Sequence, residues 1–278
     1  MKASSVLQHL AVCSWSLQPE GPQQLIDALK TLGIPRMQIA LDPIRTQPAR
    51  WSGLSDLCGQ HGVEMVSGMF GTVGEDYSTM ESIRLTGGLT PDSTWEENWK
   101  NMPALAQLAE SLKLKLVTFH AGFLPEDERA PDFAKLIQRI RAVADVFAAR
   151  QIALAFETGQ EDAATLLEFL QRLERPNLGV NFDPANMILY DKGDPIEALE
   201  ILGPRLKQCH LKDANRTRKT GTWGEEVPVG TGQVNWGRFF RTLEQVNFSG
   251  VLAIEREAGS QRLQDIKSAR QFVQSIFE

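Results

Sequence analysis

The sequence predicts a single (β/α)8 barrel, and two observations carry this prediction. Short strand-like runs alternate with longer segments of helical periodicity over the whole 278-residue chain. Eight such pairs fit one barrel domain over residues 1–278, and no Pro/Gly/Ser-rich linker or change of composition divides them. The alternative is an open doubly wound sheet, which usually has a glycine-rich phosphate turn after its first strand. Here the corresponding segment reads SWSLQPEGP, which lacks that turn.

Each strand is predicted from a short run of strand-forming residues, and a helical pattern follows it. The strands are expected at 10–15, 36–41, 63–69, 114–120, 152–157, 178–183, 206–211 and 251–256. The helices are expected at 21–32, 50–61, 95–112, 131–149, 161–173, 194–202, 235–246 and 261–277. The helix at 131–149 has the clearest pattern, because its apolar residues recur about every 3.6 positions: Phe133, Leu136, Ile137, Ile140, Val143, Ala144 and Phe147.

Composition and charge exclude several classes of protein. Hydrophobic residues make up 42% and charged residues 23%, which is typical of a globular domain and not of a disordered, collagen-like or coiled-coil chain. The net charge of −6 lacks the basic excess of a non-specific nucleic-acid binder. Three scattered cysteines frame neither disulfides nor a zinc ribbon, and no apolar run reaches membrane-spanning length. We therefore expect a soluble, cytoplasmic protein without nucleic-acid or membrane partners, and a homo-oligomer stays open.

Two long segments, 70–94 and 212–234, have no predicted regular structure. Loops of this length in a compact domain are usually functional. They follow the third and seventh predicted strands, so in a barrel both lie over the C-terminal mouth. Trp223, with Glu225 and Glu226 beside it, is a candidate lid residue in the second of these segments.

Side chains alternate between the two faces of a strand, and this alternation divides five of the predicted strands consistently. One face carries bulky apolar residues such as Val117, Leu154 and Ile254, which we expect to contact the outer helices. The other face carries small and polar residues, which we expect to point into the barrel. At the carboxyl end of each strand, where barrel enzymes carry their catalytic groups, this inner series ends in an ionisable residue. These residues are His120, Glu157, Asp183, His210 and Glu255.

Four of these residues together predict a metal site. Each alone is explained by a simpler role, such as capping the next helix or pairing with an arginine. Together, Glu157, Asp183 and Glu255 would crowd three carboxylates around the imidazole of His210, which is costly unless a cation neutralises them. Three oxygen ligands and one imidazole suit a single divalent ion such as Mn, Mg, Co or Zn, with open positions for water or substrate.

The strings AFETG, NFDPANM, HLKDA and AIERE, with VPVGTGQVNW between the last two, carry a resemblance to a known family. Over nearly its whole length the chain resembles the xylose-isomerase-like barrel superfamily of sugar-phosphate isomerases and epimerases, which includes AP endonuclease family 2-like proteins. The resemblance implies that one divalent metal is held by Glu157, Asp183, His210 and Glu255. Ketose 3-epimerases of this superfamily usually have a histidine three residues after the metal aspartate. That position is Asn186 here, which departs from the ketose 3-epimerase pattern.

The expected activity is isomerisation or epimerisation of a small carbohydrate, free or phosphorylated, by proton abstraction next to a carbonyl through an enediolate. The metal would polarise the carbonyl and stabilise the enediolate. The superfamily's epimerases use the two matching glutamates as an acid/base pair, which implies that Glu157 and Glu255 are catalytic. Contacts with the substrate are expected for four further residues, which are His120, Asn186, Lys212 and Trp15.

Other classes of function stay open. A metal-dependent dehydratase or lyase acting on a keto-cyclitol or keto-sugar uses the same geometry and differs only in where the second proton goes. An AP endonuclease of this superfamily needs three zinc ions and a basic face that binds the DNA phosphates. The four histidines of this chain are few for the ligands of three zinc ions, and its net charge of −6 disfavours a basic face. A non-catalytic sugar-binding barrel is the remaining alternative.

Overall fold

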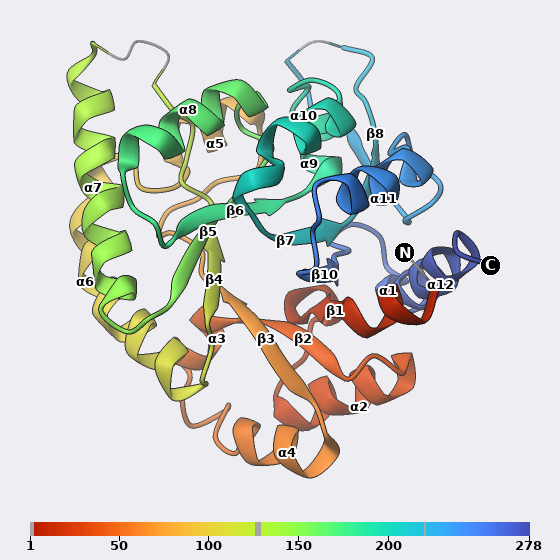
Figure 1. Cartoon of the computed structure of the whole chain (residues 1–278). Helices are drawn as coiled ribbons and strands as arrows, with labels where there is room; N and C mark the ends of the chain where they lie inside the picture. Colours follow the sequence, from red (N-terminus) through yellow and green to blue (C-terminus); the bar gives the residue numbers. More distant parts are fainter. Residues whose placement is uncertain (1–2, 126–128, 220) are drawn as a thin grey trace.

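The computed structural model describes residues 3–125, 129–219 and 221–278, and its eight parallel strands form a closed barrel (Figure 1). Around the barrel the order is β1-β10-β7-β6-β5-β4-β3-β2, so the last strand closes onto the first. The predicted (β/α)8 fold is therefore confirmed. The barrel strands are β1 (Leu10–Cys13), β2 (Arg36–Ala40), β3 (Glu64–Met69), β4 (Leu116–Phe119), β5 (Ala153–Glu157), β6 (Leu178–Phe182), β7 (Leu206–Leu211) and β10 (Val251–Ile254).

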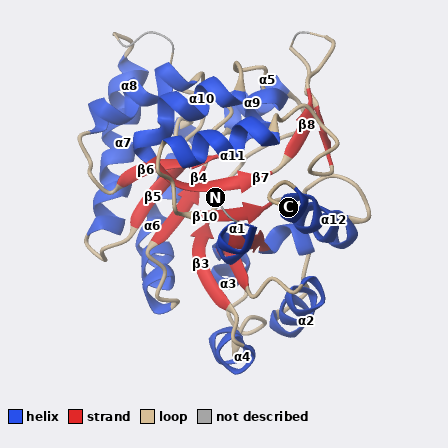
Figure 2. Ribbon diagram, turned by 45° about the vertical axis from the view of Figure 1, so that its right-hand side comes forward, coloured by secondary structure: helices blue, strands red, loops and turns tan. Residues whose placement is uncertain are grey.

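Helices surround the barrel (Figure 2). Eight of them correspond to the predicted helices: α2 (Pro22–Leu32), α4 (Leu54–His61), α6 (Asp92–Ser111), α7 (Pro131–Ala148), α8 (Ala163–Leu173), α10 (Pro195–Leu202), α11 (Trp236–Gln245) and α12 (Arg262–Ser275). In the part of the chain that the structure describes, no helix is long and apolar enough to cross a membrane.

The structure also contains short elements that the sequence analysis missed. The segment 70–94, predicted to be irregular, contains α5 (Met80–Thr86) and the start of α6. The segment 212–234 contains an antiparallel pair, β8 (Asp213–Asn215) and β9 (Glu225–Val227). The first strand ends at Cys13 rather than at residue 15, because a 3-10 turn (Ser14–Leu17) follows it. The other additions are α1 (Ala3–His9), α3 (Leu41–Thr46), α9 (Pro184–Leu189) and a 3-10 turn (Gly203–Arg205).

Bulky side chains on the outer face join the barrel to its helices. The ring centroid of Phe156 in β5 lies 5.1 Å from that of Phe119 in β4 and 6.4 Å from that of Phe169 in α8. Phe182 in β6 lies 6.4 Å from Phe239 in α11. All five rings are buried, so the apolar side of these strands faces the helices, as alternation predicts.

The inner face of the barrel is polar and hydrogen-bonded. Gln38 donates to the hydroxyl of Thr118 at 2.7 Å, and Gln208 donates to the side-chain oxygen of Gln38 at 2.8 Å. Ser67 donates to Gln208 at 2.6 Å. Buried polar groups are costly unless they find partners, and this network provides them. It also fixes His210, because the Nε2 atom of His210 lies 2.8 Å from the side-chain oxygen of Gln38.

Candidate functional site

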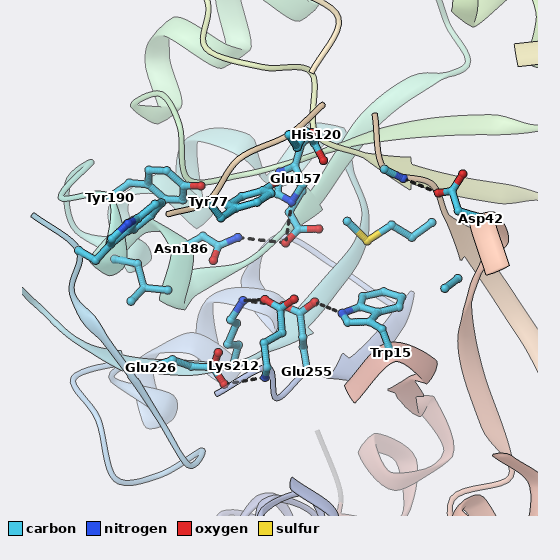
Figure 3. Close-up of a pocket in the computed structure, with 17 residues that line it drawn as sticks. Trp15, Asp42, Tyr77, His120, Glu157, Asn186, Tyr190, Lys212, Glu226 and Glu255 are labelled. Carbon is cyan, nitrogen blue, oxygen red and sulfur yellow. Dashed lines mark hydrogen bonds and ion pairs between the residues drawn. The ribbon is translucent and has the colours of Figure 1, made fainter. Parts of the chain in front are cut away.

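A cavity of about 500 Å³ opens at the carboxyl ends of the barrel strands (Figure 3). Residues of both long segments, 70–94 and 212–234, contribute to its wall. Among the residues predicted as metal ligands, catalytic groups or substrate contacts, six line the cavity: Trp15, His120, Glu157, Asn186, Lys212 and Glu255. The structure thus brings the predicted substrate contacts and both candidate catalytic glutamates to one place.

Four strands place the predicted metal ligands around one point. Glu157 is the last residue of β5, Asp183 follows β6, His210 lies near the end of β7, and Glu255 follows β10. One ligand atom from each lies within 4.8 Å of the others, and all four side chains are buried. The Nδ1 atom of His210 lies 3.4 Å from a carboxylate oxygen of Glu157, 3.5 Å from one of Asp183 and 3.4 Å from one of Glu255.

The donor set fits a divalent cation, because two of its buried atoms have no hydrogen-bond partner. The Oδ2 atom of Asp183 and the Nδ1 atom of His210 make no hydrogen bond. The other oxygen of Asp183 accepts hydrogen bonds from the backbone N–H groups of Ala185 and Asn186, which caps α9 and fixes the carboxylate. Gln38, 2.8 Å from Nε2 of His210, orients the ring so that Nδ1 faces the carboxylates. Unpaired buried polar atoms that converge in this way are typical of a metal site.

Burial and charge shift the pKa values of these groups in different directions. Burial by itself would raise the pKa of Glu157, but the ring of His210 holds it below its usual value. Burial would likewise raise the pKa of Glu255, but Lys212 and His210 hold it well below its usual value. Burial raises the pKa of Asp183, whereas the pKa of His210 is raised by Glu157 and Glu255 against the effect of burial. Both glutamates are therefore ionised at neutral pH.

Glu255 is held by two donors at once. The indole N–H of Trp15 donates to its Oε1 at 2.8 Å, and the ammonium of Lys212 donates to its Oε2 at 2.9 Å. Lys212 also donates to Glu257 at 2.8 Å and lies 3.9 Å from Asp183. Trp15 and Lys212, which were predicted as substrate contacts, thus also anchor a candidate catalytic carboxylate.

Glu157 has a different environment, made of side-chain amides and an imidazole. The amide of Asn186 donates to its Oε1 at 3.0 Å, and that of Asn181 donates to its Oε2 at 3.3 Å. The Nε2 atom of His120 lies 3.9 Å from Oε1. In Figure 3, Glu157 and Asn186 lie on one side of the cavity, and Glu255 lies on the other with Lys212 and Trp15. The two glutamates therefore face the space between them from different sides.

Several further residues line the cavity that the sequence analysis did not select. Tyr77 lies in the segment after β3, and its ring centroid is 6.3 Å from that of His120. Trp223, predicted as a lid residue, lines the cavity and lies 4.8 Å from Tyr190 between ring centroids. Three acidic residues also line it without having been selected as site residues: Asp42, Glu75 and Glu257. Asp42 lies in the short helix α3 and the other two lie in loops, so none belongs to a periodic pattern, and only Glu75 falls in a segment, 70–94, whose unusual length pointed to this region.

Glu226, the other lid candidate in the lining, pairs with Arg256 at 2.8 Å. Glu225 is exposed and does not belong to the cavity lining. The sequence pattern EE could not separate the two, because adjacent residues of a short strand point to opposite faces. Only the pairing of β9 with β8 decides which of them faces the cavity.

Three buried carboxylates and one imidazole lie together at the carboxyl end of a (β/α)8 barrel. Enzymes with this fold carry their active-site residues at this end of the barrel. The chain belongs to the xylose isomerase-like TIM barrel family, whose model matches residues 25–276. No significantly similar sequence is found among curated proteins.

Solved structures show the same fold. The xylose isomerase domain protein of Planctomyces limnophilus is 32% identical, covers 90% of this chain and 91% of its own, and superposes with a TM-score of 0.85. The probable 3-DHS dehydratase of Bacillus anthracis is 16% identical, with 94% and 97% covered and a TM-score of 0.72. D-Psicose 3-epimerase of Clostridium cellulolyticum H10, solved with D-tagatose, is 15% identical, with 100% of both chains covered and a TM-score of 0.71. The neighbours thus include a sugar epimerase and a dehydratase.

Proposed function

We propose that this protein is a divalent-metal-dependent carbohydrate isomerase or epimerase that removes a proton next to a carbonyl group. The observation that carries the proposal is the convergence of four buried ligand atoms, two of which have no hydrogen-bond partner, at the floor of a cavity. A bound cation would stabilise an acidic cluster of this kind, because it neutralises buried like charges. Glu157, Asp183, His210 and Glu255 would hold one such ion, and Mn, Mg, Co or Zn suit these donors.

When bound, the cation would polarise the substrate carbonyl and so acidify the adjacent C–H bond. Glu157 is ionised and faces the cavity, so it can accept the proton, and Asn186 at 3.0 Å fixes the orientation of its carboxylate. Glu255 faces the same space from the other side. While Glu157 keeps the proton that it removed, the carboxylate of Glu255 can take up a proton from solvent and deliver it to the opposite face or to the neighbouring carbon. Trp15 and Lys212 keep its carboxylate in place.

The remaining lining residues suit a small polyhydroxylated substrate. His120 has a buried Nδ1 atom without a hydrogen-bond partner and belongs to the cavity lining, so it can contact a substrate hydroxyl. Trp15, Tyr77 and Trp223 add aromatic surface, against which the apolar face of a sugar ring can pack. Aromatic side chains beside polar groups that fix the orientation of the ligand are typical of small-molecule sites.

A second candidate function is a dehydratase acting on a keto-cyclitol or keto-sugar. Asn186 leads to this candidate, because ketose 3-epimerases of the superfamily usually have a histidine at this position, and Asn186 donates to Glu157 instead. After the same proton abstraction, the β-hydroxyl would take up the proton that Glu157 removed and leave as water, and a carbon–carbon double bond would form as its C–O bond breaks. A trinuclear endonuclease site is not supported, since in the described part of the chain both candidate metal clusters share His210 and Glu255.

The proposal is tested by following solvent deuterium into candidate substrates. The metal-loaded protein is incubated in D₂O with ketoses, inososes and 3-keto-glycosides, and C–H exchange is measured by NMR. Glu157→Gln should lower the exchange rate by about 10²–10⁴-fold, the usual effect of losing a general base. Glu168→Gln, at an exposed position of α8, is the matched control and should exchange at the wild-type rate. Undiminished exchange in Glu157→Gln would remove this residue from the proposed role.

A further inference from the structure

We infer that the substrate is uncharged, because the chain's own carboxylates fill the positions at which this barrel would bind a phosphate group. This inference rests on the proposed function, since the cavity concerned is the proposed active site. Barrel enzymes commonly bind phosphate through backbone N–H groups of the loops after the seventh and eighth strands. These strands are β7 and β10 here, and the loops after them carry Asp213, Glu226 and Glu257.

Asp213 occupies the N–H groups after β7. Its Oδ2 accepts hydrogen bonds from the backbone N–H of Gly230 at 2.9 Å and of Gly232 at 3.1 Å. Its Oδ1 accepts from the backbone N–H of Ala214 at 2.9 Å and of Val234 at 3.1 Å. Converging N–H groups of this kind form an anion-binding concavity. Because Asp213 is fully buried in it, this concavity cannot receive a substrate anion.

Glu226 occupies the backbone N–H groups of the loop after β10. Its Oε1 accepts hydrogen bonds from the backbone N–H of Glu257 and the guanidinium of Arg256, at 2.9 and 2.8 Å. Its Oε2 accepts from the backbone N–H of Ala258 at 3.2 Å. Two backbone donors and one arginine are the groups that bind phosphate in proteins. Glu226 lines the cavity, so a substrate phosphate would have to displace a carboxylate to reach them.

The charges of the cavity wall add to this effect. The described residues that line it include six carboxylates, which are Asp42, Glu75, Glu157, Glu226, Glu255 and Glu257, but only one lysine and no arginine. That lysine, Lys212, already donates to Glu255 and Glu257 and lies 3.9 Å from Asp183. A phosphate dianion would therefore meet like charges and no free ammonium, which disfavours its binding. Sugar hydroxyls, in contrast, donate to carboxylates without such a penalty.

The experiment measures phosphate binding directly. Inorganic phosphate is titrated by calorimetry into Mg²⁺-loaded wild-type protein, Glu226→Ala and the control Glu225→Ala, which removes an exposed charge from the same strand. We expect Glu226→Ala to bind phosphate about tenfold more tightly than wild type or more, since it frees three donors. Glu225→Ala should match wild type. Equal phosphate affinity in all three proteins, with thermal melting showing that each is folded, would overturn the inference.

A second arm uses the wild-type protein alone and does not depend on the folding of any variant. Deuterium exchange is compared between D-fructose or D-tagatose and their 6-phosphates at equal concentration. Faster exchange in the free sugars supports the inference. Faster exchange in the 6-phosphates overturns it and leaves the proposed function intact. Exchange in no sugar of the full screen counts against the proposed function, and the phosphate titration then decides the inference.

Discussion

The ammonium of Lys212 lies 2.9 Å from a carboxylate oxygen of Glu255, and both side chains are almost fully buried. Lys212 follows β7 and Glu255 follows β10, so this ion pair joins two neighbouring barrel strands at the floor of the cavity. Because of this ion pair, Glu255, one of the two candidate catalytic glutamates, lies beside a positive charge. The other, Glu157, is held by neutral amides instead.

Replacing Lys212 with methionine should destabilise the metal-free protein by about 3–5 kcal/mol, because a buried carboxylate loses its partner. The low pKa of Glu255 stabilises the folded protein above the carboxyl's unfolded pKa, and this contribution is lost as pH falls through the folded pKa. The deficit of Lys212→Met should therefore be largest at neutral pH and smaller in acid. Urea unfolding at several pH values measures it.

The control for this prediction is Lys267→Met, at an exposed position of α12, which should change stability by less than about 0.5 kcal/mol. Equal stability of Lys212→Met and Lys267→Met would show that the buried ion pair does not support the floor of the cavity.

Two substitutions of Asn186 separate the effect of losing its hydrogen bond from the effect of adding a negative charge at its position. Asn186→Ala removes the donor to Glu157 and should lower the exchange rate by about tenfold. Asn186→Asp places a like charge about 3.0 Å from Glu157, which raises the pKa of that carboxyl and moves the acid limb of the rate profile to higher pH. The pH dependence of deuterium exchange distinguishes the two. Identical profiles for both variants would contradict a direct contact with the base.

Glu161, outside the proposed active site, predicts a pH dependence of stability. Burial raises its pKa to about 7, from an ordinary value of 4.5, although the backbone N–H of Leu124 donates to it. The folded protein thus holds this proton more tightly than the unfolded chain, so stability should fall as pH rises from about 4.5 to 7 and then level off. Each pKa unit corresponds to about 1.4 kcal/mol.

Glu161→Gln removes this dependence and should be more stable relative to wild type at pH 8 than at pH 5. The free energy of unfolding at the two pH values measures the effect. Glu168→Gln, an exposed position on α8, the helix that follows Glu161 in the chain, is the control and should show no such change. A constant difference between Glu161→Gln and wild type would show that the folded protein does not bind a proton at Glu161 more tightly than the unfolded chain does.

The barrel could be predicted from the sequence because its strands follow a simple physical rule. Successive side chains of a strand point to opposite faces. In a barrel strand the residues that face the helices are bulky and apolar, and the residues between them, which face the interior, are small or polar. The short elements could not be predicted. Helix α5 buries one side chain, Ile83, and has a capping box of Thr79 and Ser82 rather than an acidic one. Strands β8 and β9 have three residues each, too few to show a period.

The candidate metal ligands could be selected because each ends a strand at the same edge of the barrel. The alternation of side chains predicted that they point into the barrel, and the closure of the barrel predicted that they lie close to one another. The contacts around them depend on long-range geometry and left no local pattern. Asp213 in HLKDA shows no sign in the sequence that it binds the backbone of residues 230–234. The same holds for Glu226, whose partners lie about thirty residues away, after β10.

Binding of Mn²⁺ to wild type and Asp183→Asn tests the central claim most directly. Asparagine keeps the oxygen that caps α9 but replaces the unpaired Oδ2, so the fold is retained while one ligand is lost. Wild type should bind one Mn²⁺ per chain and gain about 2.7 kcal/mol of stability at a hundred times the dissociation constant. Asp183→Asn should lose both effects, whereas the exposed His61→Asn should keep them. Unchanged Mn²⁺ binding in Asp183→Asn would contradict the account.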